Sequence, residues 1–162
     1  MLYRPCVGIV LVNRSGFIFL AQRRGVGKCA WQMPQGGIDG DELPRSAAIR
    51  ELAEETGVDK AEIVAESLNW LEYDYPPDAK TDRASVYHGQ RQKWFLMRFL
   101  AEDTDINIGK DNHPEFKAWR WATPEEVLAE IVSFKYPIYR AVLNEFKGNH
   151  PDVFVKAEGM RA

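Results

Sequence analysis

Three glutamates lie close together in the first half of the chain, within a segment that reads as one helix. Glu51, Glu54 and Glu55 follow Arg50 in the sequence RELAEE. At about 100° per residue they fall on one stripe of the helix surface, roughly 40° to 140° from Arg50. Carboxylates this close repel one another unless a positive charge lies between them. Mg²⁺ and Mn²⁺ are hard cations that take oxygen ligands, so the pattern predicts a site for such an ion.

The helix that carries these glutamates is expected to end at about Thr56. Pro44 suits its first turn, but Leu43 stands where a capping Ser, Thr or Asp is preferred, so we expect a weak cap. The other side of the helix is aliphatic and is expected to face the core. It consists of Ala48, Ile49, Leu52 and Ala53.

A run rich in glycine precedes this helix and contains Gly36, Gly37 and Gly40. Glycine adopts backbone conformations closed to other residues and lets a ligand approach the main chain closely. A glycine-rich loop that leads into a helix N-terminus also points amide groups at an anion. Carboxylates that bind a metal, beside a loop that binds an anion, predict a polyphosphate substrate.

Length, charge and cysteine content narrow the class of protein. The 162 residues, 45% of them hydrophobic, suit one folded domain, expected over 1–148 with a frayed tail over 149–162. A formal charge of −3 gives no bulk attraction to nucleic acid, so RNA contact must be local and no DNA contact is expected. No apolar run reaches the ~18 residues of a membrane span. No signal peptide is recognised, and Cys6 and Cys29 form no C-x-x-C, so we expect reduced thiols in the cytoplasm.

Apolar runs elsewhere predict the strands that position the helix. Strands are expected at 7–12, 17–23, 62–73, 92–100 and 115–121. The intervening stretches 25–41 and 74–90 read as loops, and the second is long enough to suggest a function. Two later helices are expected, one with a capping box of Thr123 and Glu126, and one over 134–146.

The segment from residue 36 to residue 58 resembles the Nudix box, G-x5-E-x7-R-E-U-x-E-E-x-G-U, in which U is aliphatic. Its fixed positions are all filled, by Gly36, Glu42, Arg50, Glu51, Leu52, Glu54, Glu55, Gly57 and Val58. The resemblance implies an α/β fold, the Nudix α/β/α sandwich with a mixed central sheet. It also implies hydrolysis of a nucleoside diphosphate linked to another group, with Mg²⁺ or Mn²⁺ as cofactor.

Outside the box the chain resembles bacterial RNA pyrophosphohydrolases and the related diadenosine polyphosphate hydrolases of bacteria and plants. The matching stretches are YRPCVGIVLVN, WQMPQGGID, NWLEYDYP, GQRQKWF, PEFKAWRW and SFKYPIYRAVLNEF. This resemblance implies removal of pyrophosphate from the 5′ end of triphosphorylated RNA. The alternative is asymmetric hydrolysis of diadenosine tetraphosphate to ATP and AMP.

Two remoter functions remain open. A hydrolase of damaged nucleoside triphosphates would share the box but lack the other stretches. A nucleotide-binding module without turnover would have no need of three crowded carboxylates. Oligomeric state is left open by the sequence.

The resemblance assigns metal binding to four carboxylates: Glu51, Glu54, Glu55 and Glu115. The last three of these, with Arg50, form the expected catalytic group. Arg50 orients a glutamate through charge-assisted hydrogen bonds, and Glu115 completes the metal shell or acts as general base. A plain salt bridge is the alternative for Arg50, and an isolated surface carboxylate is the alternative for Glu115.

Further residues are expected to contact the substrate. Positive charge for phosphates comes from Arg4, Arg23, Lys93 and Lys135. Main-chain contacts come from Gly36 and Gly37. Aromatic rings that can stack on a base are Tyr73, Tyr75 and Phe134. Surface ion pairs and core packing are the plainer alternatives, and core packing is favoured for Trp70 and Trp94.

Overall fold

The computed structural model describes residues 2–25, 31–77, 87–111 and 113–155. Its strands are β1 (Tyr3–Val12), β2 (Ile18–Arg23), β3 (Trp31–Gln32), β4 (Gln35–Gly37), β5 (Ala61–Glu66), β6 (Leu71–Asp74), β7 (Gly89–Phe99) and β8 (Phe116–Ala122). Its α-helices are α1 (Pro44–Thr56), α2 (Pro124–Glu130) and α3 (Tyr136–Asn149). Short 3₁₀ turns span Asp103–Asp105, Ser133–Lys135 and Pro151–Val153.

The strands form one mixed sheet with the order β3-β2-β1-β7-β5, to which β4, β6 and β8 add by pairing with β1, β7 and β2. At its centre β1 and β7 run parallel, from Tyr3 opposite Gly89 to Val12 opposite Arg98. Both strands are buried on both faces over most of their length, as expected of strands covered on both sides. This confirms the predicted central strand at 92–100.

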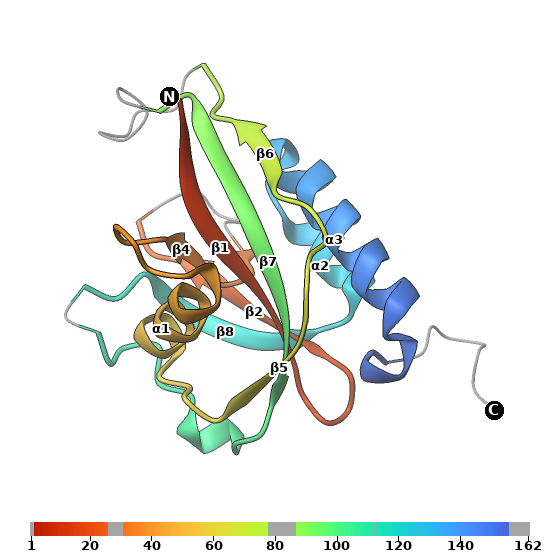
Figure 1. Cartoon of the computed structure of the whole chain (residues 1–162). Helices are drawn as coiled ribbons and strands as arrows, with labels where there is room; N and C mark the ends of the chain where they lie inside the picture. Colours follow the sequence, from red (N-terminus) through yellow and green to blue (C-terminus); the bar gives the residue numbers. More distant parts are fainter. Residues whose placement is uncertain (1, 26–30, 78–86, 112, 156–162) are drawn as a thin grey trace.

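Helices cover both faces of the sheet, so the predicted α/β/α sandwich is confirmed (Figure 1). On one face α1 packs through Ala47, Ala48 and Leu52 against alternate residues of β1 and β7. On the other face α2 and α3 close a second core. The sheet therefore separates two apolar layers, and only residues at its rim can reach both solvent and α1.

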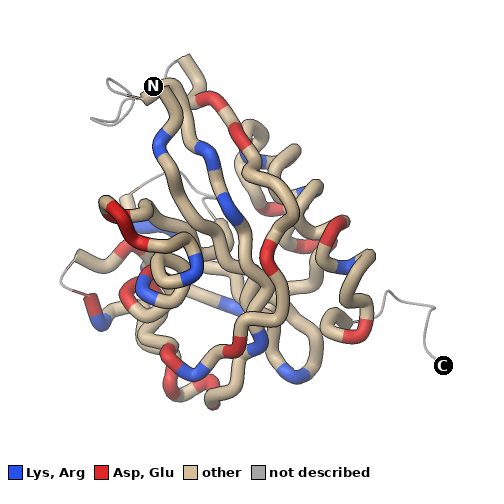
Figure 2. The backbone as a smooth tube through the Cα atoms, viewed as in Figure 1, with Lys and Arg blue, Asp and Glu red and all other residues tan. Residues whose placement is uncertain are grey.

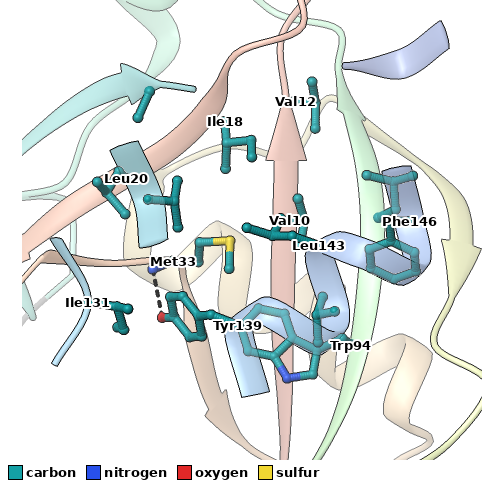
Figure 3. Close-up of a cluster of buried hydrophobic side chains, with 14 of the residues drawn as sticks. Val10, Val12, Ile18, Leu20, Met33, Trp94, Ile131, Tyr139, Leu143 and Phe146 are labelled. Carbon is teal, nitrogen blue, oxygen red and sulfur yellow. Dashed lines mark hydrogen bonds between the residues drawn. The ribbon is translucent and has the colours of Figure 1, made fainter. Parts of the chain in front are cut away.

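The second core is built around Trp94 and Tyr139, whose rings meet edge to face with centroids 5.4 Å apart (Figure 3). Trp94 lies directly over Gly8, where an added Cβ would come within 2.5 Å of the indole. The Tyr139 hydroxyl accepts a hydrogen bond of 3.0 Å from the Met33 main-chain N–H. Trp94 is thus a core residue, as predicted. Trp70 instead is only partly buried, so the predicted core packing is wrong for it. Its ring is covered by the Arg91 guanidinium, which lies 4.1 Å from the ring centroid.

Four helix ends have the features that their residues favour. The Leu43 side chain makes no cap hydrogen bond at the start of α1. At its end, Gly57 has φ 74°, a left-handed conformation that glycine adopts without strain. Thr123 and Glu126 form the predicted capping box of α2, and Pro137 lies in the first turn of α3.

Two element predictions are wrong. The single strand expected over 62–73 is two strands, β5 and β6, because the chain turns where the Ser67 hydroxyl donates to the Asn69 carbonyl. The loop expected over 25–41 contains β3 and β4, which are too short and too polar to show a strand pattern. Part of the loop expected over 74–90 lies outside the described residues.

The tail expected to fray from residue 149 is ordered as far as the structure describes it. Val153 and Phe154 are buried in the second core, and the Val155 N–H donates to the Gly16 carbonyl at 2.9 Å. Gly16 has φ 89°, and a Cβ there would overlap this segment. The remaining residues of the predicted tail, 156–162, lie outside the described part. Within the described part, every helix is too short or too polar to cross a membrane.

Candidate active site

The buried face of α1 is rotated from the face that the sequence predicted. Its buried residues are Ala47, Ala48, Leu52, Glu55 and Thr56. Ile49, expected in the core, is half-exposed. The buried positions 48, 52 and 55 recur at the helical spacing of three and four, which brings the last glutamate of the box beneath the helix.

Glu55 is therefore a buried carboxylate, with 7% of its surface exposed. One of its oxygens accepts a hydrogen bond of 3.1 Å from the Gln35 main-chain N–H. Burial raises the pKa of Glu55 well above its usual range, and the nearby charges of Glu51 and Glu115 raise it further. A buried carboxylate among like charges calls for a compensating cation, and hard oxygen donors suit a divalent one.

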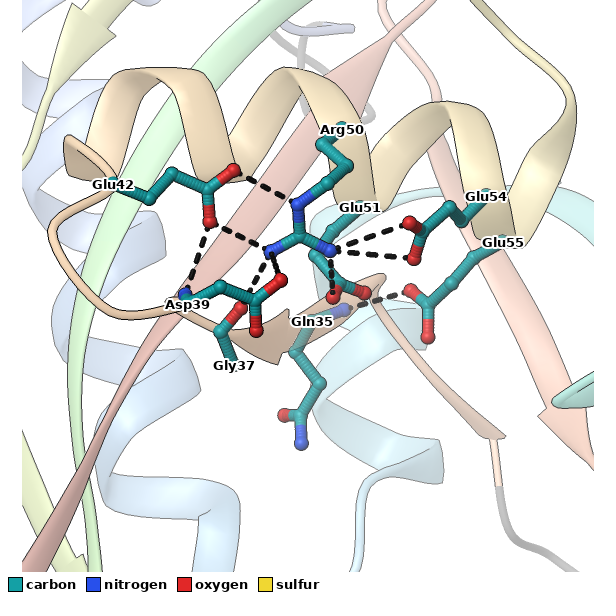
Figure 4. Close-up of polar contacts among 8 residues, drawn as sticks. All are labelled: Gln35, Gly37, Asp39, Glu42, Arg50, Glu51, Glu54 and Glu55. Atoms are coloured by element: carbon teal, nitrogen blue, oxygen red, sulfur yellow. Dashed lines mark hydrogen bonds and ion pairs between the residues drawn. The ribbon is translucent and has the colours of Figure 1, made fainter.

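Arg50 is held firmly at the start of this group (Figure 4). Its Nε and Nη2 atoms donate to the two oxygens of Glu42, each at 2.8 Å, in a bidentate pair. Nη2 also donates to the Gly37 carbonyl at 2.8 Å. A guanidinium bound in this fork geometry has little freedom to turn. The guanidinium of Arg50 therefore has a fixed orientation, which directs its Nη1 N–H groups toward the following glutamates.

The other arm of Arg50 reaches two glutamates of the stripe. Nη1 donates to Glu51 at 2.8 Å and lies 3.3 Å from the nearer oxygen of Glu54. Among the described residues, no three carboxylates converge into a preformed metal-ligand group. Arg50 accounts for this in part, because it engages Glu51 and Glu54 in ion pairs.

The pair of Glu42 and Arg50 makes the fold sensitive to acid. The hydrogen bonds from Arg50, and then the Asp39 N–H, lower the pKa of Glu42 from 4.5 to about 2. A lowered folded-state pKa contributes stability that is fully present above pH 4.5 and is lost as the pH falls toward 2. We expect Glu42→Gln to lower Tm at pH 7 and to lose less Tm than the wild type between pH 5 and about pH 2.

Thermal melts of both proteins across that pH range check this expectation. Asp41→Asn is the matched control, because Asp41 is an exposed neighbour on the same loop. Parallel Tm curves for wild type and Glu42→Gln would show that the pair contributes nothing to acid sensitivity.

Gly36 and Gly37 make room for site side chains. They lie in β4, opposite Val7 and Cys6 of β1. A Cβ on Gly36 would overlap the Glu51 carboxylate, and one on Gly37 would overlap the Arg4 guanidinium. Of the three glycines in the run before α1, only Gly40 has the positive φ that glycine adopts without strain, with φ 46°. The paired backbone of β4 thus differs from the open anion-binding loop that the sequence suggested.

Three basic residues surround the glutamates. Arg4 lies near enough to Glu51, and Arg23 near enough to Glu55, to favour the charged form of each carboxylate. Lys135 is almost fully buried, and burial followed by the charge of Arg23 lowers its pKa to about 8, while Glu55 acts in the opposite direction. Cations of this kind bind phosphate oxygens well.

Aromatic rings lie beside these cations. The Tyr73 ring is 5.6 Å from Phe134 and 6.0 Å from Tyr75, measured between centroids. Phe134 is 37% exposed, and the Lys135 ammonium lies 6.0 Å from the centre of its ring. One face of this aromatic group is accessible, so a base could stack there.

Glu115 and Lys93 have opposite outcomes. Glu115 precedes β8, and the fold brings it close enough to Glu55 to raise the pKa of that residue. Lys93 turns away, toward the edge of β7 that faces β5. Its ammonium lies 3.6 Å from Glu66 and 6.0 Å from the Trp70 ring centroid. The structure therefore does not bring Lys93 to the other predicted site residues, because its side chain extends toward β5 and pairs there with Glu66.

Sequence reasoning missed a set of buried amides next to the site. Gln90 and Gln92 are buried on one face of β7, and Gln35 contacts both Glu55 and Gln92. The signal was present in GQRQKWF, where two glutamines alternate with Arg91 and Lys93 at the start of a central strand. Polar residues at such positions need buried partners.

Known proteins with similar sequences belong to a family of hydrolases, in agreement with the carboxylate-rich site described above. The NUDIX domain family matches residues 2–142, and the chain belongs to that family. The chain is 51% identical over 150 residues to an RNA pyrophosphohydrolase of Roseobacter denitrificans, with 91% of this chain and 93% of the relative covered. It is 52% identical over 148 residues to an RNA pyrophosphohydrolase of Cereibacter sphaeroides, with 90% and 91% covered.

Solved structures give the same fold. The Escherichia coli dihydroneopterin triphosphate pyrophosphohydrolase superposes with a TM-score of 0.67, over 92% of this chain and 99% of the other. Its sequence is only 18% identical, so the likeness concerns the fold alone. Nudix hydrolases generally need a divalent metal ion, which agrees with the oxygen donors around Glu55.

Proposed function

We propose that this Nudix pyrophosphohydrolase removes pyrophosphate from the 5′ end of triphosphorylated RNA in the cytoplasm. The observation that carries the proposal is the juxtaposition of the buried Glu55 with two further carboxylates, three cations and an accessible aromatic ring. The carboxylates can bind a divalent metal ion, the cations can bind a polyphosphate, and the aromatic ring can stack on a base. The names of the curated relatives favour RNA over a dinucleotide.

The proposed cofactor is Mg²⁺ or Mn²⁺, held by Glu51, Glu54, Glu55 and Glu115. Such an ion neutralises phosphate charge and lowers the pKa of a bound water. Arg50 keeps Glu51 in position, since it is itself fixed by Glu42. Glu115 is exposed to solvent beside Glu55 and can accept a proton from water.

The phosphate chain is bound by the three cations around the glutamates. Arg4, Arg23 and Lys135 donate to its oxygens, and these charge-assisted bonds are stronger than neutral ones. Lys135 is buried, and its ammonium makes no hydrogen bond or ion pair with the described residues, so it is available for an anion. The base of the first nucleotides stacks on Phe134 and Tyr73.

Charge on the rest of the surface limits how much RNA is bound. Acidic and basic segments alternate over the molecule and do not gather into one basic face in this view (Figure 2). Affinity that depends on many phosphate contacts needs such a face. Recognition should therefore stop after the first few nucleotides of the 5′ end.

Turnover of two substrates side by side tests the proposal. We expect 5′-triphosphorylated RNA to release pyrophosphate, with kcat/KM almost independent of length beyond the first few nucleotides. Phe134→Ala should weaken binding by about 1–3 kcal/mol, the loss of one stacked base. The RNA assignment fails if triphosphorylated oligonucleotides release neither pyrophosphate nor phosphate while diadenosine tetraphosphate is split quickly into ATP and AMP.

Leu68→Ala serves as the control in this assay. Leu68 is an exposed apolar side chain between β5 and β6, so its loss removes similar surface without touching the aromatic group. Its kinetic constants should equal those of the wild type.

A further inference from the structure

A chain of buried and partly buried hydrogen bonds runs along one face of β7, next to the active site. The Trp94 indole N–H donates to Gln92 Oε1 at 3.0 Å. Gln92 Nε2 donates to Gln90 Oε1 at 2.9 Å and, over 3.4 Å, to Gln35 Oε1. Gln90 Nε2 in turn donates to the Tyr75 hydroxyl at 3.2 Å. We call these four residues, Trp94, Gln92, Gln90 and Gln35, the amide relay.

The direction of every bond in the amide relay is set at one end. An indole nitrogen can only donate, so the atom of Gln92 that faces Trp94 must be its oxygen. The Gln92 amide nitrogen then faces the other two glutamines and uses one hydrogen for each. Gln90 and Gln35 must therefore present their oxygens to Gln92 and turn their own amide nitrogens away from it.

One outer end of the amide relay reaches a phenol. Gln90 Nε2 donates to the Tyr75 hydroxyl at 3.2 Å, and the Tyr75 ring meets the Tyr73 ring edge to face, with centroids 6.0 Å apart. The Tyr75 oxygen is thus an acceptor toward the relay, and the hydroxyl keeps its own hydrogen for an acceptor on its other side.

The fold gives the relay a rigid base next to the site. Trp94 is fully buried, and its indole has room only because residue 8 is glycine. Gln35 is bound to the relay by its side chain and to Glu55 by its main-chain N–H. The Tyr73 ring packs between those of Tyr75 and Phe134. Tyr75 therefore belongs to the aromatic group on which the first nucleotide of the substrate would stack.

We propose that Gln92 is a positioning residue which, oriented by Trp94, acts through Gln90 to turn the Tyr75 hydroxyl into a hydrogen-bond donor toward the substrate. The proposal rests on the proposed function, because it assumes that a polyphosphorylated 5′ nucleotide occupies the space beside Phe134. That nucleotide offers phosphate and base oxygens and nitrogens, which are acceptors. With the relay reversed, the Tyr75 hydroxyl would donate inward and present only an acceptor to it.

Trp94→Phe is the first test, since it keeps the ring but removes the N–H that sets the direction. We expect KM for triphosphorylated RNA to rise about three- to tenfold, as for one or two lost neutral hydrogen bonds, with kcat within about twofold. Gln92→Met is the second variant and should give the same split if Trp94→Phe folds poorly. Trp121→Phe is the matched control, because it loses an equivalent indole bond, 3.2 Å to Asp103, far from the relay.

A merely structural role would give a different pattern. In a Tyr75→Phe background, Gln92→Met should raise KM no further, since the relay acts only through the Tyr75 hydroxyl. Full additivity of the KM effects, or a fall in kcat with KM unchanged, would overturn the proposal. An equal KM rise in Trp121→Phe would overturn it as well.

Failure of the relay and failure of the proposed function are separable. If the wild type does not process triphosphorylated RNA, the function assignment falls, and the same KM series is run with diadenosine tetraphosphate. Turnover is not needed to test the relay direction: ¹H–¹⁵N spectra should show the Gln90 side-chain amide signals move in Trp94→Phe but not in Trp121→Phe. Unmoved signals in Trp94→Phe overturn the relay.

Discussion

Glu55→Gln is expected to lower kcat by orders of magnitude, because it removes a charged ligand of the metal site, while the fold stays intact. Glutamine keeps the oxygen that accepts from the Gln35 N–H. It removes the charge that a divalent ion would bind. Because burial and neighbouring carboxylates already disfavour the charged form of Glu55, the neutral side chain should leave Tm unchanged or higher.

Steady-state kinetics with Mg²⁺ or Mn²⁺, and thermal melts without metal, measure the two effects. Glu54→Gln should lose kcat in the same way, and chelation of the metal should silence the wild type. Glu62→Gln is the matched control, since Glu62 is an exposed glutamate of β5 with a long ion pair of 4.0 Å to Arg98. A Glu55→Gln protein that melts normally and retains wild-type turnover would refute the assigned role.

Gly36→Ala is expected to reduce kcat by about 10²-fold without unfolding the protein, because misplacement of a site group by ~1 Å can cost that much. The added methyl group would overlap the Glu51 carboxylate. Gly36 does not have a positive φ, so alanine fits the backbone and the clash falls on the end of a flexible side chain. Glu51 must therefore swing away from its contact with Arg50.

Gly148→Ala provides the control for this substitution. Gly148 lies in α3, and a Cβ there meets nothing within 4 Å. Alanine in a helix should stabilise the protein by about 0.5–1 kcal/mol and leave kcat unchanged. Thermal melts and steady-state kinetics are measured for both variants. Full activity in Gly36→Ala would show that catalysis does not depend on the position of the Glu51 carboxylate beside Gly36.

The sequence by itself determined the features that depend on neighbouring residues. The spacing of Arg50, Glu51, Glu54 and Glu55 places them near one another on any helix, and Thr123 with Glu126 defines a helix start. The apolar run of β7 identified a strand covered on both faces. These properties follow from helical and strand geometry over a few residues, so no long-range contact was needed to predict them.

Tertiary structure alone decided which of these groups are buried and which residues from far along the chain join them. Packing of α1 on the sheet exposed Ile49 and buried Glu55, although both lie on the same short helix. The pairing of β8 with β2 carried Glu115 to Glu55, whereas Lys93 pairs with Glu66 of the neighbouring strand β5. Burial and charge at these positions depend on which elements pack together, and the whole core determines that packing. Contacts between distant segments leave no periodic pattern in the local sequence, so the sequence alone could not predict these outcomes.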